Sequence, residues 1–305
     1  MGKIAFVFAG QGAQYPGMGQ ELAQCSPAAA EIFAKLDALR PGTSAQCFGG
    51  TDEELKETKN TQPCMFAVEL AAAAALEEGG LRADMAAGFS LGEIGALTYT
   101  RAVDLETGFH LVCRRGELMQ AAAEEQPTAM AAVLKLSNEE VEQICAQFAQ
   151  VYPVNYNCPG QVSVACAKEQ LAPFSAAVKA AGGRALPLKV RGGFHSPFMA
   201  TAAQGFAQVL EECRVGQPEM PLYSNRTGAV YEGDPKPLLS QQIASPVRWE
   251  TIVRNMIAAG ADPFVELGPG KTLCGLIEKI DKTVKTYALS TQADLETILK
   301  EVKGC

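Results

Sequence analysis

The stretch AAGFSLGEIGAL, residues 86–97, decides how this chain folds. Small apolar residues lead into a single serine, Ser90, which lies between Gly88 and Gly92 and is followed by a helical pattern. The pattern G-x-S-x-G is typical of a sharp strand-to-helix turn that exposes the serine hydroxyl above a sheet. The helix N-terminus there favours negative charge, so an oxyanion could be stabilised. The pentapeptide alone leaves two interpretations open: a nucleophile, or a serine that caps the helix.

The pattern on both sides of this turn alternates between strand and helix. We expect a first strand at residues 4–9, ended by the turn GQG, and a buried alanine-rich helix at residues 62–76 with Glu69 as its only charge. Residues 128–190 change rhythm to strand, helix, two strands joined by CPG, helix and strand, with Asn138 as the expected cap of the first helix. This βαββαβ order predicts a ferredoxin-like subdomain. The large α/β domain then comprises residues 1–127 and 191–305.

Composition excludes several classes of function. The chain has 305 residues, of which 48% are hydrophobic and 20% charged, as in an ordinary globular protein. Its net charge of −8 argues against nucleic-acid binding, and it would repel an acidic partner unless Lys and Arg gather around one site. The ten cysteines form no CxxC pair, so we expect no metal site and free thiols. We expect no signal peptide, and no apolar run comes near the ~18 residues of a membrane span, so we expect a cytoplasmic protein.

A serine nucleophile needs a base, and the chain has only two histidines. His110 falls beside Arg114 and Glu117 on the polar side of an expected helix at residues 105–123, which favours a solvated surface position. His195 follows an expected strand and the loop RGGF, where side chains reach a cleft. His195 is therefore the better candidate for the base.

On the same helical wheel, Arg115 has Leu111, Val112, Leu118 and Met119 around it. An arginine among apolar residues is rarely buried without an anionic partner. Two interpretations stay open: it extends to solvent or pairs with an internal carboxylate, or it clamps the carboxylate of a substrate.

Two other patterns do not support a nucleotide site. GPGKT resembles the end of a P-loop, but Val265 stands where the first glycine is required. GQGAQYPGMG fails the dinucleotide pattern because Tyr15 occupies its last position. We expect no cofactor.

Six blocks, in order from residue 6 to about residue 275, resemble those of malonyl-CoA:acyl carrier protein transacylases. The blocks are FAGQGAQYPGMG, GFSLGE, CRRGELMQ, GGFHSPFM, QQIASPVRW and VELGPGKTL. The acyltransferase domains of polyketide synthases are relatives of this family. The resemblance implies an α/β-hydrolase-like core with an inserted ferredoxin-like subdomain, in agreement with the pattern described above.

The resemblance also implies roles for individual residues. Ser90 would carry the malonyl group as an ester, with His195 as its base. The main-chain N–H groups of Gln11 and Leu91 would form the oxyanion hole. The backbone carbonyl of Gln242 would orient His195, in the place of a triad carboxylate.

Selectivity falls to other positions in this resemblance. Arg115 would bind the free malonyl carboxylate, and Phe194 before His195 is similar to the malonyl-selecting form of the motif. One position departs from the family, which often has histidine just before the nucleophile, whereas this chain has Phe89. That residue is not the base, so the dyad is complete, but the cleft becomes more apolar.

The function implied is transfer of malonyl from malonyl-CoA to the phosphopantetheine thiol of an acyl carrier protein in fatty-acid synthesis, by a monomer without metal or cofactor. The alternatives are a trans-acting acyltransferase of a polyketide line, an acyl-thioester hydrolase on the same scaffold, and a non-catalytic carrier-docking module. Arg115 favours transfer over hydrolysis, because a hydrolase of acetyl or longer chains has no use for a buried cation.

Overall fold

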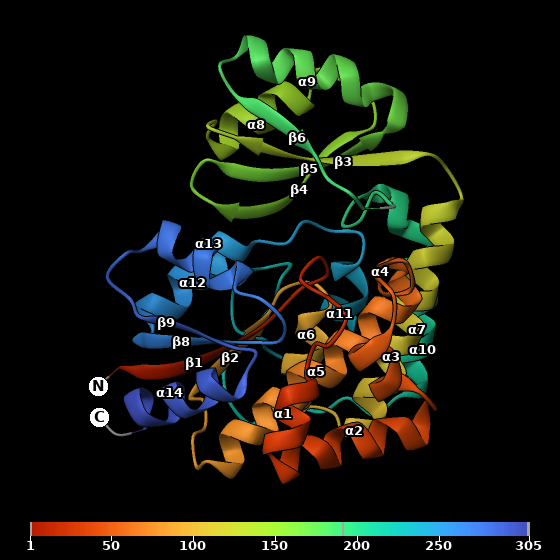
Figure 1. Ribbon diagram of the computed structural model, residues 1–305. Helices are drawn as coiled ribbons and strands as arrows, with labels where there is room; N and C mark the ends of the chain where they lie inside the picture. The colour runs from red at the N-terminus through yellow and green to blue at the C-terminus, as the bar shows by residue number, and fades with distance from the viewer. Residues whose placement is uncertain (1, 191, 304–305) are drawn as a thin grey trace.

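The computed structural model describes residues 2–190 and 192–303, which form a larger body with a smaller one on top of it (Figure 1). A parallel five-stranded sheet in the order β7-β2-β1-β8-β9 lies in the larger body. Its strands are β1 (Lys3–Phe8), β2 (Met85–Gly88), β7 (Leu222–Tyr223), β8 (Ala261–Leu267) and β9 (Thr286–Leu289). Because all five run in one direction, the loops after β1, β2 and β8 meet at a single edge of the sheet.

Strand β1 is central and is buried on both faces. Phe6 and Phe8 belong to the core that includes apolar residues of the helices α5 (Thr58–Glu78), α6 (Gly92–Tyr99) and α14 (Gln292–Val302). Ala5 and Val7 point to the other face, where they join apolar residues of α12 (Trp249–Ala258) and α13 (Thr272–Ile280). The continuous apolar run in this strand is therefore explained by helices on both faces of a parallel sheet.

Helix α5 confirms the buried alanine-rich segment: every residue from 61 to 76 except Ala74 is buried, Glu69 included. It packs against α7 (Leu105–Glu124), which carries Arg115. The remaining helices of the larger body are α1 (Gln20–Cys25), α2 (Pro27–Leu39), α3 (Thr43–Gly49), α4 (Asp52–Lys56), the 3₁₀ turn η2 (Pro197–Met199), α10 (Ala200–Glu212) and α11 (Lys236–Gln242).

The smaller body is an antiparallel sheet in the order β4-β5-β3-β6. Numbered along the chain within this subdomain, the order is two, three, one, four, or four, one, three, two from the other edge, which confirms the ferredoxin-like topology. Its elements are β3 (Thr128–Leu134), α8 (Asn138–Cys145), β4 (Val151–Cys158), β5 (Gln161–Ala167), η1 (Lys168–Gln170), α9 (Leu171–Ala180) and β6 (Arg184–Pro187). The two helices cover one face of the sheet, and their apolar residues form a separate core with it.

The prediction that Asn138 caps α8 is wrong. Ser137 is the N-cap: its side chain accepts from the Glu140 N–H, while the Glu140 carboxylate accepts from the Ser137 N–H. This reciprocal capping box satisfies two free helix donors at once, which Asn138 in the next position cannot do.

The fold class expected from the sequence, an α/β core with a ferredoxin-like insert, is confirmed. The exact boundaries at 127/128 and 190/191 stay predictions, and residues 1, 191 and 304–305 of those ranges lie outside the described residues. Within the described residues, no helix is both long and apolar enough to cross a membrane.

Candidate active site

Ser90 lies on the turn between β2 and α6 with a φ of 56°, a left-handed conformation that is strained for a residue with a side chain. The two glycines around it permit this turn for a steric reason. A Cβ on Gly88 would lie 1.9 Å from the carbonyl oxygen of Gly92, and one on Gly92 would lie 2.3 Å from that of Phe8. Strand and helix therefore approach so closely that neither position accepts a side chain.

The Ser90 hydroxyl faces the imidazole of His195, with 2.7 Å between Oγ and Nε2. The other ring nitrogen, Nδ1, lies 3.0 Å from the backbone carbonyl oxygen of Gln242. A carbonyl can only accept, so Nδ1 carries the proton and Nε2 is free to accept from Ser90. The helix-cap interpretation of Ser90 is wrong, because the N-cap of α6 is Leu91 and no side chain caps the helix.

The two histidines have opposite surroundings. His110 is exposed on α7, as expected, whereas His195 is only 3% exposed. Burial, and then the positive charge of Arg115, lower the pKa of His195 to about 4. At neutral pH the imidazole is therefore uncharged and able to take a proton.

Arg115 is 1% exposed and points at the same hydroxyl. Its Nη2 donates to Ser90 Oγ at 3.2 Å and to Gln242 Oε1 at 2.8 Å, and its Nη1 donates to Gln62 Oε1 at 2.9 Å. Burial lowers the pKa of the guanidinium to about 10, against the opposing effect of the Glu93 charge, so it stays positive at neutral pH.

The first interpretation of Arg115 was extension to solvent or pairing with an internal carboxylate. Extension to solvent is wrong, since the side chain is buried. Nor does any carboxylate in the described part of the chain form an ion pair with it; its contacts are neutral amides and a hydroxyl. The neighbouring Arg114 is exposed and pairs with Glu117. The site thus holds a buried cation, beside the nucleophile, that has no direct anionic partner.

The two main-chain amides expected to form an oxyanion hole lie on the loops after β1 and β2. Gln11 follows Gly10, on which a Cβ would lie 2.8 Å from the ring of Phe89, so the GQG turn packs directly against the nucleophile loop. Neither the Gln11 nor the Leu91 N–H donates a hydrogen bond within residues 2–190 and 192–303. Both remain available as donors, and their role stays a prediction.

Two phenylalanines lie next to the dyad in the chain. Phe89 packs edge-on against Trp249, with 5.4 Å between ring centroids. Phe194 is 8% exposed and lies within the apolar core. Its part in substrate selection stays a prediction.

Three polar residues at the site were missed by the sequence analysis: Gln62, Glu93 and Asn225. Glu93, on α6, is fully buried, and burial raises its pKa to about 7. A charged residue on an otherwise apolar helix, three positions after the nucleophile, was a signal that could have found it. Gln62 and Asn225 reach the site through tertiary contacts and carry no such signal.

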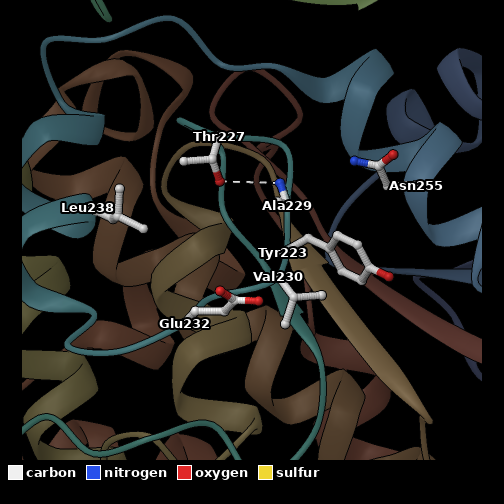
Figure 2. A pocket seen from close by; sticks show the side chains of 7 residues that line it. All are labelled: Tyr223, Thr227, Ala229, Val230, Glu232, Leu238 and Asn255. Carbon is white, nitrogen blue, oxygen red and sulfur yellow. Dashed lines mark hydrogen bonds between the residues drawn. The ribbon is translucent and has the colours of Figure 1, made fainter.

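A separate hollow of about 580 Å³ lies beside the loop that follows β7 (Figure 2). Its lining residues are Tyr223, Thr227, Ala229, Val230, Glu232, Leu238 and Asn255. Neither Ser90 nor His195 lines it, so this hollow is not where the dyad would meet a substrate. No cluster of three or more His, Cys, Asp or Glu residues that could hold a metal occurs in the described ranges.

Comparison with known proteins is consistent with this geometry. A family model described as acyl transferase domain matches residues 5–298. The malonyl CoA-acyl carrier protein transacylase of Bacillus subtilis (strain 168) is 37% identical over 311 residues, which cover 99% of this chain and 98% of that protein. The crystal structure of the same-named protein from Clostridium perfringens superposes with a TM-score of 0.96 at 33% identity, over 99% of this chain and 98% of that one.

A second similar structure is a type II polyketide synthase acyl carrier protein in complex with its malonyl-transacylase. Its TM-score is 0.94 at 36% identity, and the match covers 98% of this chain and 99% of that chain.

Proposed function

This chain belongs to the acyl transferase domain family, and we propose that it transfers the malonyl group from malonyl-CoA to the phosphopantetheine thiol of an acyl carrier protein. The transfer passes through a malonyl ester on Ser90. The observation that carries this proposal is the position of Arg115, a buried guanidinium 3.2 Å from the hydroxyl that hydrogen-bonds His195. A substrate with a free carboxylate supplies the anion that this cation lacks.

In the first half of the reaction, His195 Nε2 takes the proton of Ser90 as Oγ attacks the thioester carbonyl carbon. The oxyanion that forms is stabilised by the N–H groups of Gln11 and Leu91. The C–S bond then breaks, and the imidazolium gives its proton to the departing coenzyme A thiolate. The Gln242 carbonyl keeps the ring oriented by accepting from Nδ1 throughout.

In the second half, His195 takes the proton of the phosphopantetheine thiol, whose sulfur attacks the malonyl ester. The C–O bond to Ser90 breaks, and the proton returns to Oγ. Ester and thioester differ little in group-transfer energy, so the exchange is reversible and needs no further energy source. Water must lose to the thiol, and the apolar rings of Phe89 and Phe194 help to exclude it.

Selectivity follows from leaving a charge unpaired. An acetyl group presents no carboxylate to Arg115, so the buried guanidinium is not compensated and acetyl-CoA is a poor substrate. Phe194 adds a steric limit against larger acyl groups. A hydrolase of simple acyl chains would gain nothing from this cation.

The decisive experiment is the intact mass of the protein after brief incubation with malonyl-CoA, beside acetyl-CoA and beside the Ser90→Ala variant. We expect a gain of one malonyl group, absent in the variant and weak with acetyl-CoA. Free malonate at the rate of transfer, without a carrier protein, would instead identify a hydrolase. Carrier binding without any adduct would identify a docking module.

The carrier belongs to fatty-acid synthesis in this proposal. The similarity to a type II polyketide transacylase makes a polyketide carrier the second candidate, and transfer rates to the two carriers distinguish them. We also propose a cytoplasmic location, supported by the free thiols of all nine cysteines in the described ranges.

A further inference from the structure

Asn225 contacts the nucleophile turn at two points, Gly88 and Ser90. It follows β7, whose pairing with β2 places it beside the end of that strand. Its side-chain oxygen accepts from the Ser90 N–H at 2.7 Å, and its side-chain nitrogen donates to the Gly88 carbonyl at 2.5 Å. One side-chain amide therefore bridges the main chain of Gly88 and that of Ser90.

This contact matters because the turn is strained. A residue with a side chain at φ 56° persists only where its surroundings hold it, at a cost of order 1–3 kcal/mol. The Ser90 N–H finds its acceptor in a side chain, Asn225, and the Ser90 carbonyl accepts from the Gln242 side chain at 2.8 Å. Both main-chain groups of the nucleophile are thus fixed by side-chain amides.

Asn225 is itself held by a buried carboxyl group. Glu93 Oε1 accepts from the Asn225 main-chain N–H at 2.7 Å and from the Tyr231 hydroxyl at 2.8 Å. Glu93 is fully buried and lies one helical turn after Ser90 on α6. The contacts therefore close a ring that runs from Ser90 along α6 to Glu93, across to Asn225, and back to the Ser90 amide.

We propose that Asn225 is a positioning residue for the transfer reaction, held in place by Glu93 and Tyr231, and that it fixes the Ser90 main chain so that Oγ stays against His195. This rests on the proposed function, in which Ser90 is the nucleophile. The Leu91 N–H, next in the chain, is aimed by the same turn, so one support sets both the nucleophile and an expected oxyanion donor.

The test measures how fast Ser90 is acylated in the Asn225→Ala variant, by rapid quench and intact mass with malonyl-CoA. We expect acylation to slow about 100-fold, since a misplacement of about 1 Å costs that much, while KM for malonyl-CoA stays within about threefold. The matched control is Asn255→Ala. Asn255 donates to Gly228 in the same loop at 2.9 Å but does not touch the turn, so acylation should be unchanged.

A second readout separates this proposal from the proposed function. Phenylmethanesulfonyl fluoride sulfonylates an activated serine, with loss of fluoride, and needs no malonyl recognition. We expect the Asn225→Ala rate to fall with this reagent as well. A wild-type protein that takes the sulfonyl group but no malonyl would overturn the proposed function alone, and one that reacts with neither reagent would overturn both.

Stability must be measured beside activity, by urea unfolding. A purely structural Asn225 predicts a lower unfolding midpoint with normal acylation of the folded molecules, and that result overturns the proposal. If Asn225→Ala does not fold, Tyr231→Phe decides. This substitution removes one hydrogen bond to Glu93 and keeps the aromatic side chain. We expect acylation of Ser90 to be about fivefold slower at unchanged KM. An unchanged acylation rate in Tyr231→Phe would then overturn the proposal.

Discussion

Replacing Arg115 with alanine should reduce malonyl transfer strongly while sparing or raising acetyl transfer. The guanidinium has five N–H donors, of which three are used by Gln62, Gln242 and Ser90. The donor to Ser90 Oγ is released when that oxygen becomes an ester. Two or more N–H donors of Arg115 are therefore available to the free carboxylate of a malonyl group that is esterified to Ser90 Oγ.

The magnitude follows from these contacts. A hydrogen bond to a charged group contributes about 1.5–3 kcal/mol, so two of them to the carboxylate contribute about 3–6 kcal/mol. The hydrogen bond from Arg115 to the Ser90 hydroxyl is lost when that oxygen is acylated, which offsets about 1 kcal/mol of this gain. The balance of about 2–5 kcal/mol corresponds to a loss of about 30-fold to 5,000-fold in kcat/KM for malonyl-CoA. Acetyl-CoA loses no such contact, so its kcat/KM should hold or rise.

The assay is transfer to holo acyl carrier protein, with malonyl-CoA and acetyl-CoA in parallel. Arg114→Ala is the matched control, because Arg114 is the adjacent arginine on α7 but is exposed and paired with Glu117. We expect it to leave both rates unchanged. An equal fall of both substrates in Arg115→Ala would show that Arg115 only supports the fold, and would refute its role in selection.

Three further predictions concern the dyad and the turn. Ser90→Ala should abolish the malonyl adduct while its unfolding midpoint stays unchanged, and an adduct in that variant would mean another nucleophile. Because the pKa of His195 is lowered to about 4, the base is already deprotonated at mild acidity, so kcat/KM should be level above about pH 5 and fall as His195 is protonated near pH 4; a fall centred near pH 6.5 would contradict this. Gly92→Ala places a Cβ 2.3 Å from the Phe8 carbonyl oxygen and should destabilise the fold by about 3 kcal/mol or more in urea unfolding, whereas Gly275→Ala, with open space around its Cβ, should not.

The fold was predictable where local patterns decide it. The nucleophile turn, the strands around it and the βαββαβ order follow from apolar periodicity and glycine positions. Helix α5 was expected to begin at Gln62, yet it begins at Thr58 and Pro63 lies inside it. One helix was expected after Pro16, then a polar region to about Asn60, whereas four helices lie between Gln20 and Lys56; the shorter of them have little periodicity to detect.

The candidate site was predictable only in part, because local patterns decide only some of its residues. Ser90 comes from a motif and His195 from elimination, and Arg115 stands out as a cation among apolar residues. Asn225 reaches the Ser90 amide from 135 positions away, and Gln62 reaches Arg115 from 53. Such contacts depend on how distant elements pack, and a neutral amide in the sequence gives no sign of which partner it will meet.

Gln242 explains why the site can use a neutral residue where a triad has a carboxylate. Its carbonyl accepts from His195, its Oε1 accepts from Arg115, and its Nε2 donates to the Ser90 carbonyl. A carboxylate in this place would raise the pKa of His195 and pair with Arg115, so the cation would no longer be available to the substrate. The acid that does face Arg115 electrostatically is Glu93, whose pKa burial raises to about 7, which weakens it as a competing anion. The arrangement therefore orients the base without neutralising the guanidinium that we propose selects malonyl.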